Sequence, residues 1–223
     1  DTNLALTQSA SDIILSKYTG TDSQLWLLNS DGLQGFAGYC KNDNTNNIKA
    51  ADIGGLFGEI VEAASFDELK KYAESDTPYT IVVTKNISVT NLKLDSSGRY
   101  YCPDGRIYVH SNKTIIGSYS AHTMYNVQFC TATSKGVGNN LIIKNFELQH
   151  DSESNGNDSI VVYFGSGENL WVDHVTFTGH KAVNTASTGN VDWDKFLACC
   201  YDADYCTVSD SSFGLHEYGV ILG

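Results

Sequence analysis

The chain has 223 residues, of which 41% are hydrophobic, and its formal net charge at pH 7 is -12. This composition is sufficient for one folded domain with its own core, and the sequence has no apolar run long enough for a membrane-spanning helix. The acidic charge argues against a nucleic-acid-binding protein, because phosphate backbones are bound by basic surfaces. A polyanionic ligand would need a bridging cation or a locally basic cleft.

Cysteines and glycosylation acceptors favour an extracellular protein. The Asn-x-Ser/Thr acceptors begin at Asn86, Asn112 and Asn157, and the six cysteines are Cys40, Cys102, Cys130, Cys199, Cys200 and Cys206. Both features are typical of secreted chains, in which disulfides persist. The even number permits three disulfides, but the sequence does not select a pairing. A zinc site that combines three cysteines with His216 is disfavoured, because paired Cys-x-x-Cys spacing is missing.

Residues 1–34 have a pattern that differs from the rest of the chain. The segments Asn3–Leu6, Ser11–Tyr18 and Gln24–Trp26 are similar to the last repeat of a ricin-type β-trefoil lectin, whose repeats end in Gln-x-Trp. A single repeat cannot close a trefoil, so no complete sugar site is expected here. A strand-rich cap on the remaining fold explains the same residues. We therefore interpret 1–34 as an N-terminal cap or a partial lectin-like repeat.

A short amphipathic helix is predicted from Ser65 to Ala73. Ser65 is a suitable N-cap, and Glu68 completes a capping box. The apolar residues that share one side of this helix are Phe66, Leu69, Tyr72 and Ala73. We expect the helix to cap the N-terminal end of the fold, and we expect strands at 79–84 and 87–92.

One apolar pattern recurs along the second half of the chain. Its central copy is 169–177, and the other copies are 112–117, 140–148 and 205–213, so that successive copies are 28, 29 and 36 residues apart. In an extended strand, Leu170, Val172 and His174 would share one face, and Trp171, Asp173 and Val175 would share the other. Short strands that recur with variable insertions are typical of a solenoid.

The recurring strands predict a parallel β-helix. A single strand cannot bury its apolar face, so each copy must stack on the next. The alternative, an antiparallel sandwich, would place tight Asn-Gly or Asp-Gly turns between neighbouring strands, and such turns are scarce between the copies. The sequence therefore favours an all-β solenoid.

Four motifs in this region resemble successive signatures of the pectate lyase and pectin lyase family. They are Ser111–Gly117, Asn169–His174, Asp204–Ser209 and Phe213–Gly223, in the family's order. The resemblance covers 35–223 and implies a right-handed parallel β-helix. Because the family's solenoid continues past the last signature, we expect the β-helix to be incomplete at its C-terminal end. The resulting open strand edge would accept a second chain.

The resemblance also implies calcium ligands. The family cleaves uronic acid polymers by β-elimination, with calcium held by clustered carboxylates. Asp158 and Asp194 match two of the calcium-binding positions, and Asp192 is a nearby substitute. Gly156 and Ala198 stand where further acidic ligands are expected. The resemblance therefore implies a weak calcium site, with solvated loop carboxylates as the alternative.

We expect substrate contacts from Trp193, Lys195, His216 and Tyr218. Tyr218 replaces the lysine that contacts substrate in the family, and an aromatic ring stacks on a sugar face, which favours esterified or neutral glycans. Asp173 and His174 match a family motif that we expect to be structural and to hydrogen-bond between coils.

The arginines bear on catalysis. The chain contains only Arg99 and Arg106, and both precede the recurring pattern. The family's proton-abstracting arginine follows the signature that here ends at Gly223, so the resemblance implies that this chain lacks the base.

These observations predict a secreted polysaccharide lyase-like protein that acts on pectin or pectate by β-elimination. Its expected partner is a pectic or other acidic polysaccharide, and neither nucleic acid nor a membrane is expected. The alternative is a non-catalytic β-helix that binds a glycan through an aromatic face or assembles with another chain.

Overall fold

The computed structural model describes residues 4–9, 12–17, 35–38, 53–94, 96, 100–119, 121–135, 138–150, 160–179, 195–215 and 218–223. The chain divides into two compact units, Asp1–Asp31 and Gly32–Gly223. In the first unit, β1 (Leu4–Ser9) pairs with β2 (Asp12–Lys17) in an antiparallel hairpin. This unit falls inside the region that the sequence assigned to a cap or a lectin-like repeat, and that assignment stays a prediction.

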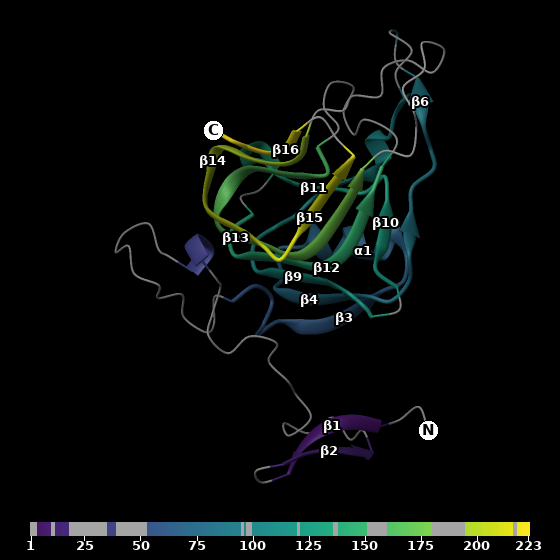
Figure 1. The fold of residues 1–223 in the computed structure, drawn as a ribbon, viewed down its shortest axis with the longest axis vertical. Coiled ribbons are helices and arrows are strands. Elements are labelled where there is room, and N and C mark those ends of the chain that lie inside the picture. The colour runs from purple at the N-terminus through teal and green to yellow at the C-terminus, as the bar shows by residue number, and fades with distance from the viewer. Residues whose placement is uncertain are drawn as a thin grey trace. The chain divides into compact units, whose positions relative to one another are not determined.

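The second unit is built around a twelve-stranded sheet that curls around a hydrophobic core (Figure 1). Its strands are β3 (Glu59–Ala63), β4 (Tyr79–Val83), β5 (Ile87–Ser88), β8 (Arg106–Tyr108), β9 (Lys113–Gly117), β10 (Thr123–Tyr125), β11 (Gln128–Thr131), β12 (Leu141–Gln149), β13 (Val162–Gly179), β14 (Lys195–Ser209), β15 (Ser212–Leu215) and β16 (Tyr218–Leu222). Outside this sheet, β6 (Lys93–Leu94) pairs with β7 (Tyr100–Tyr101). The short 3-10 turns are η2 (Gly35–Gly38), η4 (Pro103–Gly105) and η5 (Thr133–Lys135).

The strands of the large sheet form three parallel ladders. The first ladder aligns Val61, Ile81, Ile115, Ile143, Val172 and Val208. The second aligns Ile87, Met124, Leu148, Phe177 and Phe213. The third aligns Ile107, Phe129, Val162, Leu197 and Val220. Because β12, β13 and β14 each take part in more than one ladder, the chain coils from ladder to ladder, which is consistent with a parallel β-helix.

The register of the first ladder confirms the repeat found in the sequence. Ile115 pairs with Ile143, Ile143 with Val172, and Val172 with Val208. These pairs have the same separations as the recurring copies, because each copy adds one coil. The pairing is parallel throughout this sheet, so the antiparallel sandwich is wrong.

Asparagines occupy the corner that precedes the first ladder. Asn112, Asn140 and Asn169 have φ values of 59°, 58° and 63°, in the left-handed region that asparagine tolerates better than most residues. The Asn140 amide donates to Asn112 Oδ1 at 2.8 Å, and Asn140 Oδ1 accepts from Gly54 N at 2.7 Å. Asn169 donates to the carbonyl of Ala37 at 2.8 Å. The first of these bonds links successive coils at the point where the backbone turns, and the other two bind earlier segments of the chain to the same corner.

A second corner corrects the predicted alternation of the central copy. His174 has a φ of 51° and lies between the first and second ladders, so it ends the regular alternation. Val175 and Phe177 follow it and are buried in the core with Leu170. The expectation that Val175 shares a face with Trp171 is wrong, because one left-handed residue inverts the sense of alternation.

The outer side of the first ladder is covered near Trp171. Trp171 is only 3% exposed and packs with Ile142, Ile53 and Ala37 in a separate apolar cluster. Ala37 belongs to η2, and its backbone amide donates to Thr207 Oγ1 at 2.8 Å. This packing explains why an outward-facing tryptophan is buried.

The helix α1 (Phe66–Ala73) begins as predicted. Ser65 Oγ accepts from the Glu68 amide at 3.3 Å, and the Glu68 carboxylate accepts from the Ala64 amide at 2.8 Å. Leu69 and Ala73 are buried in the core. In the described part of the chain, no helix has the length and apolar character needed to cross a membrane.

Candidate functional site

A pocket of about 230 Å³ opens on the outer side of the third ladder. It is lined by Arg106, Gln128, Ile160, Tyr163, Lys195, Ala198, Cys200 and Tyr201. These residues come from β8, β11, β13 and β14 and from the residues next to them, so four successive coils build one surface.

Strand alternation explains why these side chains face outward. Tyr108, Cys130, Tyr163 and Ala198 are aligned across the ladder, one position after the aligned core residues. Beyond this row, the pairing of β13 with β14 is irregular, and Tyr201 has a φ of 58° and is 80% exposed. The irregularity places a tyrosine ring beside the pocket.

A chain of hydrogen bonds orients Arg106. Arg106 Nε donates to Gln128 Oε1, and Gln128 Nε2 donates to the carbonyl of Ile160. These three residues belong to three successive coils, so the guanidinium is fixed by the stacking itself. A side chain held in this way can bind a ligand with little loss of rotamer freedom.

Positively charged side chains cluster on this side of the protein, although its net charge is negative. Arg106 and Lys195 line the pocket. The guanidinium of Arg106 lies 6.0 Å from the centre of the Tyr108 ring, and Lys135 Nζ lies 5.7 Å from the same ring. The described lining residues include no carboxylate. The pocket is therefore locally basic, which the net charge of -12 does not suggest.

Tyr163 is a neutral member of the lining. Burial, followed by interactions with Cys200, raises the pKa of the Tyr163 hydroxyl well above its usual value. The hydroxyl therefore stays protonated at neutral pH and serves as a hydrogen-bonding group, because a base would need a pKa close to the working pH.

The structure places some of the residues that the sequence singled out. Lys195 lines the pocket, and so does Ala198, where the family resemblance led us to expect a carboxylate. Tyr218 begins β16, next to Lys195 in the ladder, but its side chain lies outside the described residues. The other expected site residues, all outside the described residues, are Asp158, Asp192, Trp193, Asp194 and His216.

Sequence reasoning missed Arg106 and Gln128. Arg106 precedes the recurring pattern and was therefore set aside, yet parallel stacking brings it into the same pocket as Lys195. The strand pairing of β8 with β11 aligns Arg106 with Gln128. These two residues are 22 positions apart, a spacing that differs from those of the recurring copies, so the repeat could not reveal this pairing.

The described residues of the pocket do not fit a calcium ion. Calcium requires several oxygen ligands, usually with carboxylates among them. The described lining supplies two cationic side chains and an alanine at the position of an expected ligand. The prediction of a calcium site in this region therefore depends only on Asp158, Asp192 and Asp194.

Asp173, His174 and Asp210 form a separate group whose ligand atoms lie within 4.8 Å of one another and could hold a metal ion. The Asp173 carboxylate is already engaged, however. It accepts from Lys144 Nζ at 2.7 Å, from His174 Nδ1 at 2.9 Å and from Ser209 Oγ at 2.6 Å. Such a carboxylate has little capacity left for a cation.

The same contacts give Asp173 a structural role. Burial alone would raise the pKa of Asp173, but the hydrogen bonds from Lys144, Ser209 and His174 hold it below its usual value. Lys144 lies on the preceding coil and Ser209 on the following one. The prediction of hydrogen bonds between coils is confirmed for Asp173, whereas the contact of His174 is with Asp173 of the same strand.

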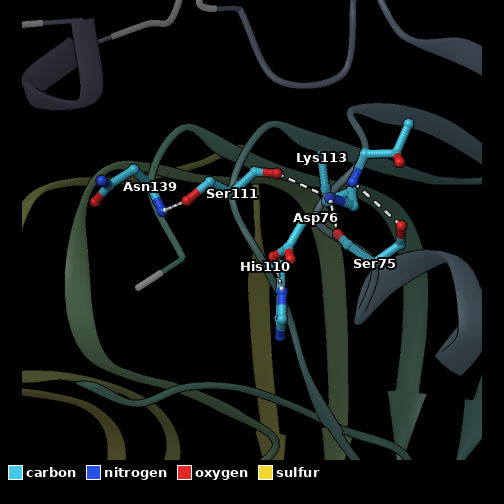
Figure 2. Close-up of polar contacts among 7 residues, drawn as sticks. Ser75, Asp76, His110, Ser111, Lys113 and Asn139 are labelled. Carbon is cyan, nitrogen blue, oxygen red and sulfur yellow. Dashed lines mark hydrogen bonds and ion pairs between the residues drawn. The ribbon is translucent and has the colours of Figure 1, made fainter. Parts of the chain in front are cut away.

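A second polar cluster surrounds the buried Lys113 (Figure 2). Lys113 Nζ donates to the carbonyl of Ser75 at 2.7 Å and to that of Ser111 at 2.8 Å. Nearby, His110 Nδ1 lies 2.7 Å from Asp76 Oδ1. Burial lowers the pKa of Lys113 to about 8. Because Ser75 follows α1, this cluster fastens the end of the helix to the first ladder.

Comparison with known proteins places the chain in a family. The family model described as Pectate lyase matches residues 7–223. A pectin lyase of Bacillus subtilis is 38% identical over 194 residues, which cover 87% of this chain and 50% of that protein. A pectin lyase of Pseudomonas marginalis is 33% identical over 193 residues, covering 86% and 52%. Pectate lyase plyB of Emericella nidulans is 28% identical over 186 residues, covering 83% and 47%.

The chain thus spans about half the length of these relatives. The match nevertheless extends over nearly all of the chain, and it agrees with the curled parallel sheet and with the four motifs. The chain belongs to the pectate lyase family.

Proposed function

We propose that the chain carries a substrate-binding face of an extracellular polysaccharide lyase that cleaves pectin by β-elimination. The observation that supports this most directly is the basic pocket built by Arg106 and Lys195 in a protein of net charge -12. A pectic chain presents galacturonate carboxylates or their methyl esters, and both accept hydrogen bonds from cationic donors. Because the polymer is too large to enter a cell, we place the protein outside it.

The chemistry explains why cations are useful here. In β-elimination, a base removes the C5 proton, the electron pair of that bond forms the C4–C5 double bond, and the C4–O bond breaks with its electrons leaving on oxygen. The C5 proton becomes acidic when donors stabilise the negative charge that develops on the adjacent carboxyl group. Arg106 and Lys195 are suited to this binding role. The base stays unassigned.

We further propose that this pocket acts without calcium and prefers esterified pectin. The described lining offers cations where a metal would otherwise be needed, and the replacement of the expected lysine by Tyr218 favours a less charged substrate. The relatives from Bacillus subtilis and Pseudomonas marginalis are both named pectin lyases. The calcium roles of Asp158, Asp192 and Asp194 are accordingly proposed to be weak.

The test is an assay for unsaturated uronide on methylated pectin and on polygalacturonate, with calcium or with EDTA. It uses the protein that contains this sequence together with any residues that flank it in its gene. We expect product from methylated pectin in EDTA, and we expect Arg106→Ala and Lys195→Ala each to lower kcat/KM by about tenfold or more. Arg106→Lys should restore only part of the loss, because it keeps the charge but not the planar fork.

Lys135→Ala is the matched control. It removes a positive charge from the same side of the molecule but does not line the pocket, so it should change kcat/KM by less than about twofold. If Lys135→Ala and Lys195→Ala lowered kcat/KM equally, the effect would come from the overall positive charge on this side of the molecule and not from the pocket.

A second function, glycan binding without cleavage, is favoured by the tyrosines at the pocket. Tyr163 and Tyr201 line it, and aromatic rings stack on sugar faces. Binding of pectin fragments to this chain, measured by calorimetry and lost in Tyr201→Ala, together with no product from any substrate, would replace the lyase proposal with this one.

A further inference from the structure

The strand that carries Arg106 lies at one end of the third ladder. Among the described strands, β8 pairs only with β11, in the register that aligns Arg106 with Gln128. The backbone groups on the other edge of β8 need another partner, because buried N–H and C=O groups are costly when they are left unpaired. A helix that covers such an edge can supply this partner.

Two side chains of the α1 segment bind this edge of β8. Lys70 Nζ donates to the carbonyl of Arg106 at 2.7 Å, and Glu74 Oε1 accepts from the backbone amide of Tyr108 at 3.0 Å. The same Glu74 oxygen lies 3.3 Å from Lys70 Nζ. The Lys70–Glu74 pair therefore binds two alternate residues of β8 as one unit, through hydrogen bonds that are strengthened by charge.

The backbone of α1 continues this pattern past the end of β8. The carbonyl of Ala73 accepts from the amide of His110 at 2.9 Å. The amide of Val109, one residue earlier, donates in the opposite direction, to the carbonyl of Cys130 in β11 at 2.8 Å. This alternation is that of a strand with a partner on each side. The end of α1 therefore occupies the place of a further strand beside β8.

We propose that Lys70 and Glu74 are positioning residues for Arg106 in the pocket. The proposal rests on the proposed function, because it assumes that the Arg106 side chain binds substrate. Lys70 holds the backbone of Arg106 at one edge of β8, and Gln128 holds the guanidinium at the other. Loss of the Lys70 ammonium would release the backbone, and a small displacement of the guanidinium is enough to weaken its hydrogen bond to a substrate.

Lys71 provides the matched control. Adjacent residues of a helix face different directions. Lys71 is exposed, and its Nζ lies 5.2 Å from the centre of the Tyr72 ring. Lys71→Met and Lys70→Met therefore remove the same charge from the same helix, but only Lys70→Met removes the contact with Arg106.

The first measurement is hydrogen exchange of the β8 backbone, followed by mass spectrometry in the same full-length protein as the lyase assay. In Lys70→Met and Glu74→Ala, we expect the peptide that contains Tyr108 and His110 to exchange about fivefold faster or more, because its amides lose partners on α1. In Lys71→Met the exchange should be unchanged. This measurement does not depend on activity.

The second measurement is a double-mutant cycle on kcat/KM with methylated pectin in EDTA. Lys70→Met should lower kcat/KM by about fivefold, and the loss should fall on the same parameter, kcat or KM, as the loss in Arg106→Ala. In the Arg106→Ala background, Lys70→Met should cost less than about twofold, because the side chain through which it acts is gone. In the Lys195→Ala background the fivefold loss should remain. Lys70→Arg should restore most of the activity, since a guanidinium also donates to a carbonyl.

The two measurements separate the possible failures. An equal loss from Lys70→Met with and without Arg106 would overturn the proposal, because a general loss of stability affects both backgrounds alike. Unchanged exchange of β8 in Lys70→Met and Glu74→Ala, or equal effects in Lys71→Met, would also overturn it. If the exchange responded as expected but the unmutated protein neither bound nor cleaved pectin, the proposed function would fail and the positioning role with it. Glu74→Ala serves for the same cycle if Lys70→Met does not fold.

Discussion

At the scale of single residues, Lys113 couples stability to alkaline pH. Its side chain is fully buried, and burial lowers its pKa from 10.5 to about 8. Between these values the unfolded chain binds more protons than the folded protein, so the free energy of unfolding rises with pH. Below pH 8 the Lys113 ammonium is buried in its charged form, and its desolvation lowers the free energy of unfolding by the full amount.

We expect the difference in unfolding free energy between the unmutated protein and Lys113→Met to increase from pH 8 to pH 10.5, by at most about 3 kcal/mol. Methionine fills a similar volume but does not titrate, so other groups cancel in the comparison. Urea denaturation of both proteins across this range measures the difference. Parallel pH profiles would contradict a depressed pKa at Lys113.

Asp173 allows a second prediction at this scale. Asp173→Asn removes the charge that pairs with Lys144 and weakens the bonds to Ser209 and His174. Asp173 is 2% exposed, so we expect the free energy of unfolding at pH 7 to fall by about 1–3 kcal/mol. The loss should shrink as pH falls below about 4, because the pKa of Asp173 is depressed and its stabilising charge disappears at low pH.

Asp210→Asn is the control for this change, and denaturant titration at pH 7 and pH 3 compares the two. Asp210 belongs to the same group of ligand atoms but is exposed, so its substitution should change stability by less than about 0.5 kcal/mol. Similar losses in both variants would argue for a shared site in which Asp210 matters as much as Asp173, such as a metal site.

At the scale of elements, the asparagine corner is what sets the coils in register. Asn140 combines a φ of 58° with hydrogen bonds to Asn112 and Gly54. Asn140→Ala should lower the free energy of unfolding by about 2–4 kcal/mol, because alanine is strained in this conformation and the amide partners are left unsatisfied.

Asn140→Gly separates the two causes. Glycine accepts the left-handed conformation but cannot replace the amide, so this variant should be about 1 kcal/mol more stable than Asn140→Ala. Chemical denaturation of both variants gives the comparison. If they were equally destabilised, backbone strain at this corner would be negligible.

Sequence patterns predicted the first ladder well, the second ladder in part, through Leu148, Phe177 and Phe213, and the third ladder poorly. Three of the four copies of the first ladder begin at an asparagine, and all four contain alternating apolar residues, so their spacing reproduced the observed register. In the third ladder, Ile107, Phe129 and Val162 are preceded by segments of unequal length, and no periodicity in the sequence connects them. His174 shows a related limit, because histidine adopts a left-handed φ only at a minority of positions and the sequence does not mark this one.

The candidate site was only partly predictable for the same reason. Lys195 was expected to contact substrate because it lies near a recognised motif, and it lines the pocket. Arg106 is in the same pocket but comes from a coil that carries no recognised motif. A pocket that spans several coils depends on which coils are neighbours, and that information lies in the pairing register.

At the scale of the whole molecule, apolar side chains are exposed on the last described coil. Leu222 is 76% exposed, Val220 39% and Phe213 36%. Phe213 stacks on Phe177 with ring centres 4.8 Å apart, so one face of it is covered within the chain. β16 also lies at the end of the strand order of the large sheet, and an edge strand offers unpaired backbone groups to another chain.

We expect the 223-residue chain to self-associate through this coil as its concentration rises. Apolar surface and an open strand edge together favour association, and a charged side chain opposes it. Leu222→Lys and Val220→Lys should each shift the monomer–oligomer equilibrium toward monomer, as measured by sedimentation velocity over a series of concentrations. Tyr119→Lys is the control, since Tyr119 is 98% exposed on another coil, and it should behave like the unmutated protein. If the protein were a monomer at every concentration, or if all three variants shifted the monomer–oligomer equilibrium equally, β16 would not mediate self-association.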